Sequence, residues 1–162
     1  LKDIEHHMLH FLENHDEQRI ASPEFAGNAE KGRPAMVVSA TISTSPTMIY
    51  FGQEVGEPGA EDAGFGKPSR TSIFDYIGVP HLQRWVNNKK YDGGQATESE
   101  KELRDFYQRL LNFSIMSEAL MGEYFDLHTI NREQTACFIH LLSSFERLSE
   151  NEKLILISNF DA

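Results

Sequence analysis

The chain has 162 residues, 25 of them acidic and 15 basic, which gives a formal net charge of −10. This length supports one domain with a hydrophobic core, but a complete (β/α)8 barrel needs about 250 residues. The negative charge argues against nucleic acid or an anionic membrane surface as a partner. No stretch approaches the roughly 20 apolar residues of a membrane span. Composition does not distinguish a cytoplasmic from a periplasmic or secreted protein.

The single cysteine, Cys137, lies in the apolar run ACFI at 136–139. A lone thiol in such a run is typical of a buried, unreactive side chain and not of a nucleophile. We therefore predict no internal disulfide and no cysteine chemistry.

Near the N-terminus, an apolar stretch is followed directly by a dense polar cluster. Residues 8–12 predict a buried strand, and residues 13–19 have the sequence ENHDEQR. In barrel enzymes the catalytic groups follow the C-terminal ends of strands. The cluster containing Asn14, His15 and Asp16 is therefore the first candidate site, although a His-Asp pair after a strand is also typical of a simple hydrogen-bonded turn.

Closely spaced histidines in the same region raise an alternative, a metal-dependent hydrolase using His6, His7, His10 and Asp16. Neutral imidazoles on one face of a helix can share a metal ion. A strand, however, sends neighbouring side chains to opposite faces, and no cysteine or carboxylate set with ligand spacing accompanies them. We therefore predict no metal site here.

The next segment has the pattern of a strand-helix-strand unit. Pro34 fits the first turn of a helix over residues 35–44, whose β-branched content also permits a strand. Residues 47–52 predict a buried parallel strand, and the polar residues Gln53 and Glu54 follow it directly. Together with the N-terminal strand, this order makes one βαβ unit.

Two of these segments resemble the α-amylase family of glycoside hydrolases. The triplet formed by Asn14, His15 and Asp16 resembles the family's last short sequence block, at the end of the seventh barrel strand. Residues 46–56, PTMIYFGQEVG, resemble the end of the eighth strand and occur in the right order, about one helix later. Residues 70–76, RTSIFDY, resemble a third family stretch loosely, because Ser72 stands where the family has proline.

The middle of the chain is rich in glycine, acidic residues and then aromatic rings. Residues 56–72 predict a flexible rim loop, and their glycine spacing fits no phosphate-binding loop. Rings are frequent from residue 74 to residue 91, and Trp85 is the foremost candidate for a sugar-stacking platform. Aromatic residues beside aliphatic ones also predict ordinary core packing.

The last third begins with the clearest helix of the chain. Thr97 and Glu100 form a capping-box pattern, and an apolar stripe then predicts a helix that ends near residues 114–117. Short β-type runs follow at 123–127, 136–142 and 153–157, with a polar turn at 149–152. These runs predict the first strands of an antiparallel domain.

We therefore predict an α/β fold, the C-terminal part of a (β/α)8 TIM barrel over residues 1–118, followed by the start of an antiparallel β-sandwich domain over residues 119–162. The resemblance implies a fragment, with the nucleophile and acid carboxylates upstream of residue 1. The isolated fragment should be inactive, and we expect it to self-associate through open strand edges.

The resemblance also implies a function, a retaining α-glucan hydrolase acting on α-1,4 links of starch, glycogen or maltooligosaccharides. It gives Asp16 the catalytic role of stabilising the transition state, with His15 and Asn14 binding and positioning sugar hydroxyls. Arg19 is expected either to bind sugar or to pair with Glu17 or Asp16.

We expect Gln53 and Glu54 to contact and position the sugar-binding side chains without contacting the sugar themselves. No cofactor is expected, and a calcium ion of the parent enzyme would be held by upstream residues. The α-glucan is the expected partner. The alternatives are a non-catalytic glucan-binding module and an α-glucan transglycosylase of the same family, in which an acceptor sugar replaces water.

Overall fold

The computed structural model describes residues 3–62, 64, 66–72, 78–127 and 142–160. The chain splits into two compact units. Unit 1 consists of Leu1–His10, Arg33–Thr47 and Leu110–Ala162, and unit 2 consists of Phe11–Gly32 and Met48–Arg109. Each unit is described by itself below.

Unit 1 is built on helix α1, Arg33–Thr41, and a small sheet. Met36 and Ala40 are buried on one side of α1, which lies against strand β5. The predicted helix at 35–44 is therefore confirmed, with an earlier start and end. Thr41 is the last residue of the helix, and its hydroxyl donates a 2.5 Å hydrogen bond to the carbonyl oxygen of Val37.

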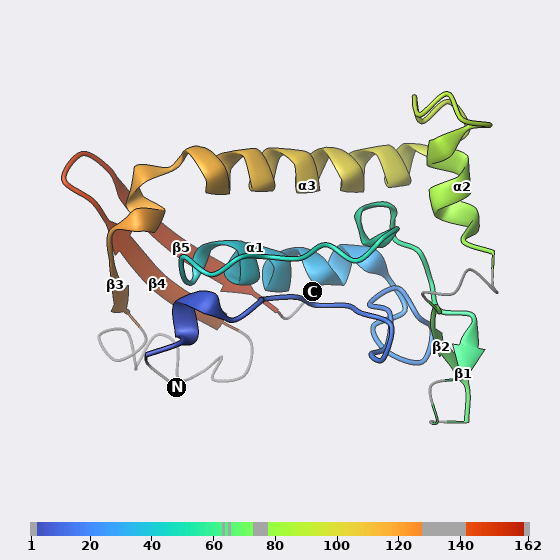
Figure 1. The fold of residues 1–162 in the computed structure, drawn as a ribbon, viewed down its shortest axis with the longest axis horizontal. Helices are drawn as coiled ribbons and strands as arrows, with labels where there is room; N and C mark the ends of the chain where they lie inside the picture. The colour runs from blue at the N-terminus through green and yellow to red at the C-terminus, as the bar shows by residue number, and fades with distance from the viewer. Residues whose placement is uncertain (1–2, 63, 65, 73–77, 128–141, 161–162) are drawn as a thin grey trace. The chain divides into compact units, whose positions relative to one another are not determined.

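The sheet of unit 1 has three antiparallel strands in the order β3-β4-β5 (Figure 1). These strands are β3 (Glu123–Asp126), β4 (Leu142–Leu148) and β5 (Lys153–Asn159). The predicted strands at 123–127 and 153–157 are confirmed, as is the polar turn, in which Ser149 N donates to Glu152 O at 2.9 Å. Most of the predicted run at 136–142, including Cys137, lies outside the described residues. A one-turn 3-10 helix, Glu118–Met121, precedes the sheet.

The two predicted barrel strands at 8–12 and 47–52 are wrong as extended strands. Their contact is a single parallel bridge between His10 and Thr47, supported by a 2.9 Å hydrogen bond from His10 N to Pro46 O. A central strand of a parallel sheet needs hydrogen-bonded neighbours along its whole length. Within the described part of the chain, these segments have only this bridge, so no ladder forms.

Unit 2 contains helix α2 (Pro80–Val86), most of helix α3 (Glu98–Met116), and the short antiparallel pair β1 (Glu61–Asp62) and β2 (Pro68–Arg70). One-turn 3-10 helices lie at Ala29–Gly32 and Gln53–Val55, and another at Glu5–His7 belongs to unit 1. The loop predicted at 56–72 therefore contains a hairpin. Asp62 Oδ1 accepts hydrogen bonds from Gly64 N at 2.7 Å and Gly66 N at 3.0 Å across its turn.

Helix α3 has the predicted capping box. Thr97 N donates to Glu100 Oε2 at 2.9 Å, and Glu100 N donates to Thr97 Oγ1 at 3.3 Å. These two bonds satisfy backbone N–H groups that the first turn of a helix leaves unpaired. Leu103 and Tyr107 are buried on the predicted apolar stripe.

The described strands thus form small antiparallel sheets beside helices, a mixed α/β arrangement. The barrel fragment and the domain boundary at residues 118 and 119 stay predictions. Among the described residues, the helices lack the combination of length and apolar character that crossing a bilayer requires.

Candidate functional site

The polar cluster predicted at residues 14–16 forms a tight turn in unit 2. Asn14 Oδ1 accepts hydrogen bonds from Asp16 N at 2.7 Å and from Glu17 N at 2.8 Å. This is the way asparagine side chains mimic a backbone turn. The Asn14 side chain therefore fixes the backbone that carries the next two polar groups.

His15 and Asp16 lie exposed on this turn. His15 Nε2 is 3.3 Å from Asp16 Oδ2, and the two side chains are 48% and 69% exposed. Arg70 Nη1 donates a 3.3 Å hydrogen bond to the His15 carbonyl oxygen and links the turn to strand β2. Both side chains are therefore accessible to a ligand. The catalytic role of Asp16 and the binding role of His15 stay predictions.

Arg19, in contrast, is completely buried. Its exposed fraction is 0%, that of Glu13 is 2%, and Arg19 Nη1 lies 2.7 Å from Glu13 Oε2. The ion pair expected with Glu17 or Asp16 is therefore wrong, because Arg19 turns inward to Glu13. Nothing of the Arg19 side chain is exposed in this structure to contact sugar.

The Arg19 guanidinium joins three segments of unit 2. Nε and Nη2 donate to Thr71 Oγ1 at 3.0 and 2.7 Å, and Nη2 donates to the Phe51 carbonyl oxygen at 2.7 Å. Its Cζ atom lies 4.3 Å from the centre of the Tyr50 ring, within the range of a cation–π interaction. Tyr50 Oη donates in turn to the Thr71 carbonyl oxygen at 3.1 Å. One buried cation thus connects the polar cluster to both later segments that carry the family resemblance.

Glu13 is the residue of this network that the sequence analysis missed. Its Oε1 atom accepts a 2.7 Å hydrogen bond from Ile20 N, so the carboxylate holds both the side chain and the backbone beyond the turn. Burial raises the pKa of Glu13 above its ordinary value, although the charge and hydrogen bond of Arg19 act to lower it. The available signal was its position directly after the apolar run, where a side chain still points into the interior.

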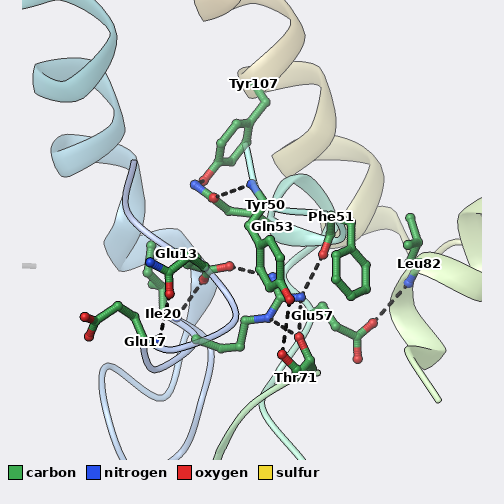
Figure 2. Close-up of polar contacts among 12 residues, drawn as sticks. Glu13, Glu17, Ile20, Tyr50, Phe51, Gln53, Glu57, Thr71, Leu82 and Tyr107 are labelled. Atoms are coloured by element: carbon green, nitrogen blue, oxygen red, sulfur yellow. Dashed lines mark hydrogen bonds and ion pairs between the residues drawn. The ribbon is translucent and has the colours of Figure 1, made fainter. Parts of the chain in front are cut away.

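Gln53 and Glu54 differ in their surroundings. Gln53 is buried, and its side chain accepts from Tyr50 N at 3.2 Å and donates to the Tyr107 hydroxyl at 3.1 Å (Figure 2). It therefore holds the aromatic residue that stacks on Arg19. Glu54 is half-buried, and its charge contributes to the raised pKa of Glu13. Their predicted role behind a sugar-binding site stays a prediction.

A second buried carboxylate, Glu57, was also missed. It is 1% exposed and accepts hydrogen bonds from His81 N at 2.8 Å and Leu82 N at 3.1 Å, at the start of helix α2. Burial raises the pKa of Glu57, and the bonds from α2 act against this. Glu57 therefore connects the segment after residue 52 to α2.

One face of the Trp85 ring is covered by a neighbouring side chain. The Arg104 guanidinium carbon lies 3.8 Å from the centre of the Trp85 ring, so a cation covers the ring face. The side chain is half-buried. The structure therefore supports the packing interpretation of Trp85 over the sugar-platform interpretation.

A hollow of about 480 Å³ in unit 2 lies apart from the predicted residues. His81, Arg84 and Glu100 are among its lining residues, whereas Asn14, His15 and Asp16 are not. Glu100 accepts hydrogen bonds from Arg84 and lies 3.0 Å from His81 Nδ1, so its charge is already matched. Glu100 in this hollow is therefore engaged by its own neighbours.

A metal-dependent hydrolase receives no support from the described part of the chain. There, no group of three or more His, Cys, Asp or Glu side chains is placed to share a metal ion. His6 Nδ1 lies 3.1 Å from the Thr44 hydroxyl, and His10 Nδ1 lies 3.2 Å from the Ser39 carbonyl oxygen. These two histidines thus have protein partners.

Comparison with protein-family models finds no match, and comparison with curated proteins also finds none. Among solved structures, the chain is similar to one described as the crystal structure of alpha-amylase from H. orenii, with a TM-score of 0.56 and 20% sequence identity. The similarity covers 94% of this chain and 30% of the amylase chain. The chain therefore has an amylase-like fold and spans about 30% of the length of that amylase.

Proposed function

We propose that this chain is part of an α-amylase-like retaining glycoside hydrolase that cleaves α-1,4 links of starch, glycogen or maltooligosaccharides. The observation that carries the proposal is an exposed His15–Asp16 pair on an ordered turn of a chain with an amylase-like fold. The fold similarity alone does not specify an activity, since one fold supports many functions. The chemistry of the turn is therefore the more specific support.

In this proposal Asp16 contributes electrostatic and hydrogen-bonding stabilisation. A retaining glycosidase also needs a nucleophile and an acid whose carboxyl groups are about 5 to 5.5 Å apart. We propose that both come from residues outside this chain. The Asp16 carboxylate accepts hydrogen bonds from ring hydroxyls, and His15 lies beside the same hydroxyls as a donor. Bonds that tighten as the oxocarbenium ion forms lower the barrier selectively.

Arg19 has a different role in the proposal from the one expected from the sequence. Because its guanidinium is buried against Glu13, Phe51 and Thr71, we assign it to positioning and not to sugar binding. It holds the ends of the exposed turn at a fixed place in unit 2. This arrangement is typical of binding groups that are supported by a rigid interior.

The test is hydrolysis of maltoheptaose and soluble starch by the complete natural protein that contains these residues. We expect Asp16→Asn to lower kcat by at least about 100-fold with a small change in KM. Glu17→Gln is the matched control, because Glu17 is an exposed carboxylate on the same turn. Product analysis with an added acceptor sugar separates hydrolysis from transglycosylation. An unmodified protein inert on every α-glucan, or full activity in Asp16→Asn, would contradict the proposal.

A further inference from the structure

A buried arginine lies in unit 1, and among the residues that the structure describes no carboxylate pairs with it. Arg147 on strand β4 is 5% exposed and is paired across the sheet with Tyr124 on β3. Its Nη2 atom donates to the Leu120 carbonyl oxygen, and Nη1 lies 3.5 Å from the Ile42 carbonyl oxygen. These partners are neutral, so the guanidinium charge is not compensated by them.

No Asp or Glu side chain of the described residues forms an ion pair with Arg147, and its buried Nε atom has no hydrogen-bond partner there. Burial lowers the pKa of Arg147, yet arginine keeps its charge under all ordinary conditions. An unpaired charge in the interior is costly. An interior arginine in this state is therefore expected to be matched by an anion from outside the described residues.

Arg147 lines a hollow of about 640 Å³ whose walls also include His6, His10, Thr44 and Tyr124. Guanidinium, imidazolium and hydroxyl groups are all donors to oxyanions, and arginine binds carboxylate and phosphate groups with two parallel hydrogen bonds. His10 Nδ1 lies 3.2 Å from the Ser39 carbonyl oxygen, so Nε2 is the ring nitrogen of His10 that this contact does not use.

We infer that this hollow binds the oxyanion of a small organic phosphate or carboxylate through Arg147. The apolar residues Ile42 and Met121 in its lining favour an organic ligand over a bare inorganic ion. Glu5 also lines the hollow, 3.8 Å from His6 Nε2. Its negative charge opposes the binding of an anion, so removing this charge should strengthen binding. The inference does not depend on the proposed hydrolase activity, since none of the sugar-site residues takes part.

The experiment measures binding of phenyl phosphate and benzoate to the purified protein by calorimetry and thermal shift, with sodium chloride at equal ionic strength as the reference. We expect saturable binding of at least one probe, and the stronger one identifies the phosphate or the carboxylate as the preferred group. Arg147→Met should weaken this binding at least tenfold, roughly the effect of losing one charge-assisted hydrogen-bonded pair. Arg109→Gln, on the exposed side of α3, is the matched control and should bind as the unmodified protein does.

The Tm of the ligand-free protein distinguishes a ligand-binding arginine from a purely structural one. Replacing an unpaired buried charge by an apolar side chain of similar length should raise the Tm of the ligand-free protein. If Arg147→Met does not fold, Glu5→Gln still tests the inference. This exposed substitution removes a negative charge and should therefore tighten binding of the anion. Absence of saturable binding by both probes, equal affinity in Arg147→Met, or weaker binding in Glu5→Gln would overturn the inference.

Discussion

Glu13 and Arg19 form an ion pair with a 2.7 Å contact on the two sides of an exposed turn, and both side chains are buried. Between them, His15, Asp16 and Glu17 are exposed, and Asn14 and Gln18 are half-buried. The buried charge pair therefore fixes the two ends of the turn, and the exposed side chains of the turn face solvent. A ligand that contacts the turn would meet groups whose backbone is already ordered.

The first prediction concerns the stability that this ion pair contributes. Glu13→Gln leaves the buried Arg19 charge unmatched, so we expect a loss of about 3 to 5 kcal/mol in the free energy of unfolding. Urea denaturation of the protein and its variant measures this loss. Glu17→Gln, an exposed carboxylate four residues later, should change the midpoint very little. A loss below about 1 kcal/mol in Glu13→Gln would show that the pair is solvated.

Comparison of sequence and structure shows which elements follow from local information. Helix α3 could be predicted because its capping box, Thr97 with Glu100, and its apolar stripe lie within one segment. Strand β5 and the turn before it could be predicted for the same reason. The strands predicted at 8–12 and 47–52 were wrong because a parallel strand depends on neighbours distant in sequence. Among the described residues, the bridge between His10 and Thr47 is the one backbone pairing of these segments.

The candidate site shows the same division. The turn at Asn14 could be anticipated, since asparagine commonly bonds to the backbone two residues later. The partner of Arg19 could not, because proximity in sequence favoured Glu17 or Asp16. Its other acceptor, Thr71, is 52 residues away in the chain. Long-range packing decided that Arg19 turned inward, and no local pattern carries that information.

The second prediction separates the geometry of the turn from its chemistry. Asn14→Ala removes the acceptor of two backbone N–H groups, so we expect a loss of about 1 kcal/mol in stability and a weaker site. Asn14→Asp keeps the acceptor oxygen and should retain the stability. Thermal unfolding measures the first effect, and glucan hydrolysis by the complete protein measures the second. Equal stability of Asn14→Ala and the unmodified protein would mean that the turn forms without this side chain.

The third prediction concerns acid pH and Glu100, a carboxylate that is 5% exposed. Burial acts to raise its pKa, but hydrogen bonds from Arg84 and Thr97 N outweigh burial and hold the pKa below the ordinary value of 4.5. A depressed carboxyl pKa contributes stability that is present above the unfolded value and is lost as pH falls through the folded value. The advantage of the protein over Glu100→Gln should therefore shrink as pH falls below 4.5.

Urea midpoints of both proteins, measured at several pH values on each side of the ordinary carboxyl pKa, test this prediction. Glu98→Gln is the control, since Glu98 is exposed in the same helical turn. A stability difference between the protein and Glu100→Gln that does not change with pH would contradict the pKa direction. Glu13 and Glu57, whose pKa values are raised, are present in both proteins and cancel in the comparison.

The last prediction concerns the close packing after the Tyr50 segment. Gly52 has φ 84°, and a Cβ atom there would lie 2.9 Å from the Cβ atom of Glu57. Both atoms are attached to the backbone, so the contact is not relieved by a side-chain rotation. Gly64 has a similar φ of 89° but nothing within 4 Å of its added Cβ. Gly64→Ala should therefore cost only the strain of a positive φ, about 1 to 2 kcal/mol, whereas Gly52→Ala should cost clearly more. Urea denaturation of the two variants measures the difference, and equal losses would show that the Glu57 backbone moves aside freely.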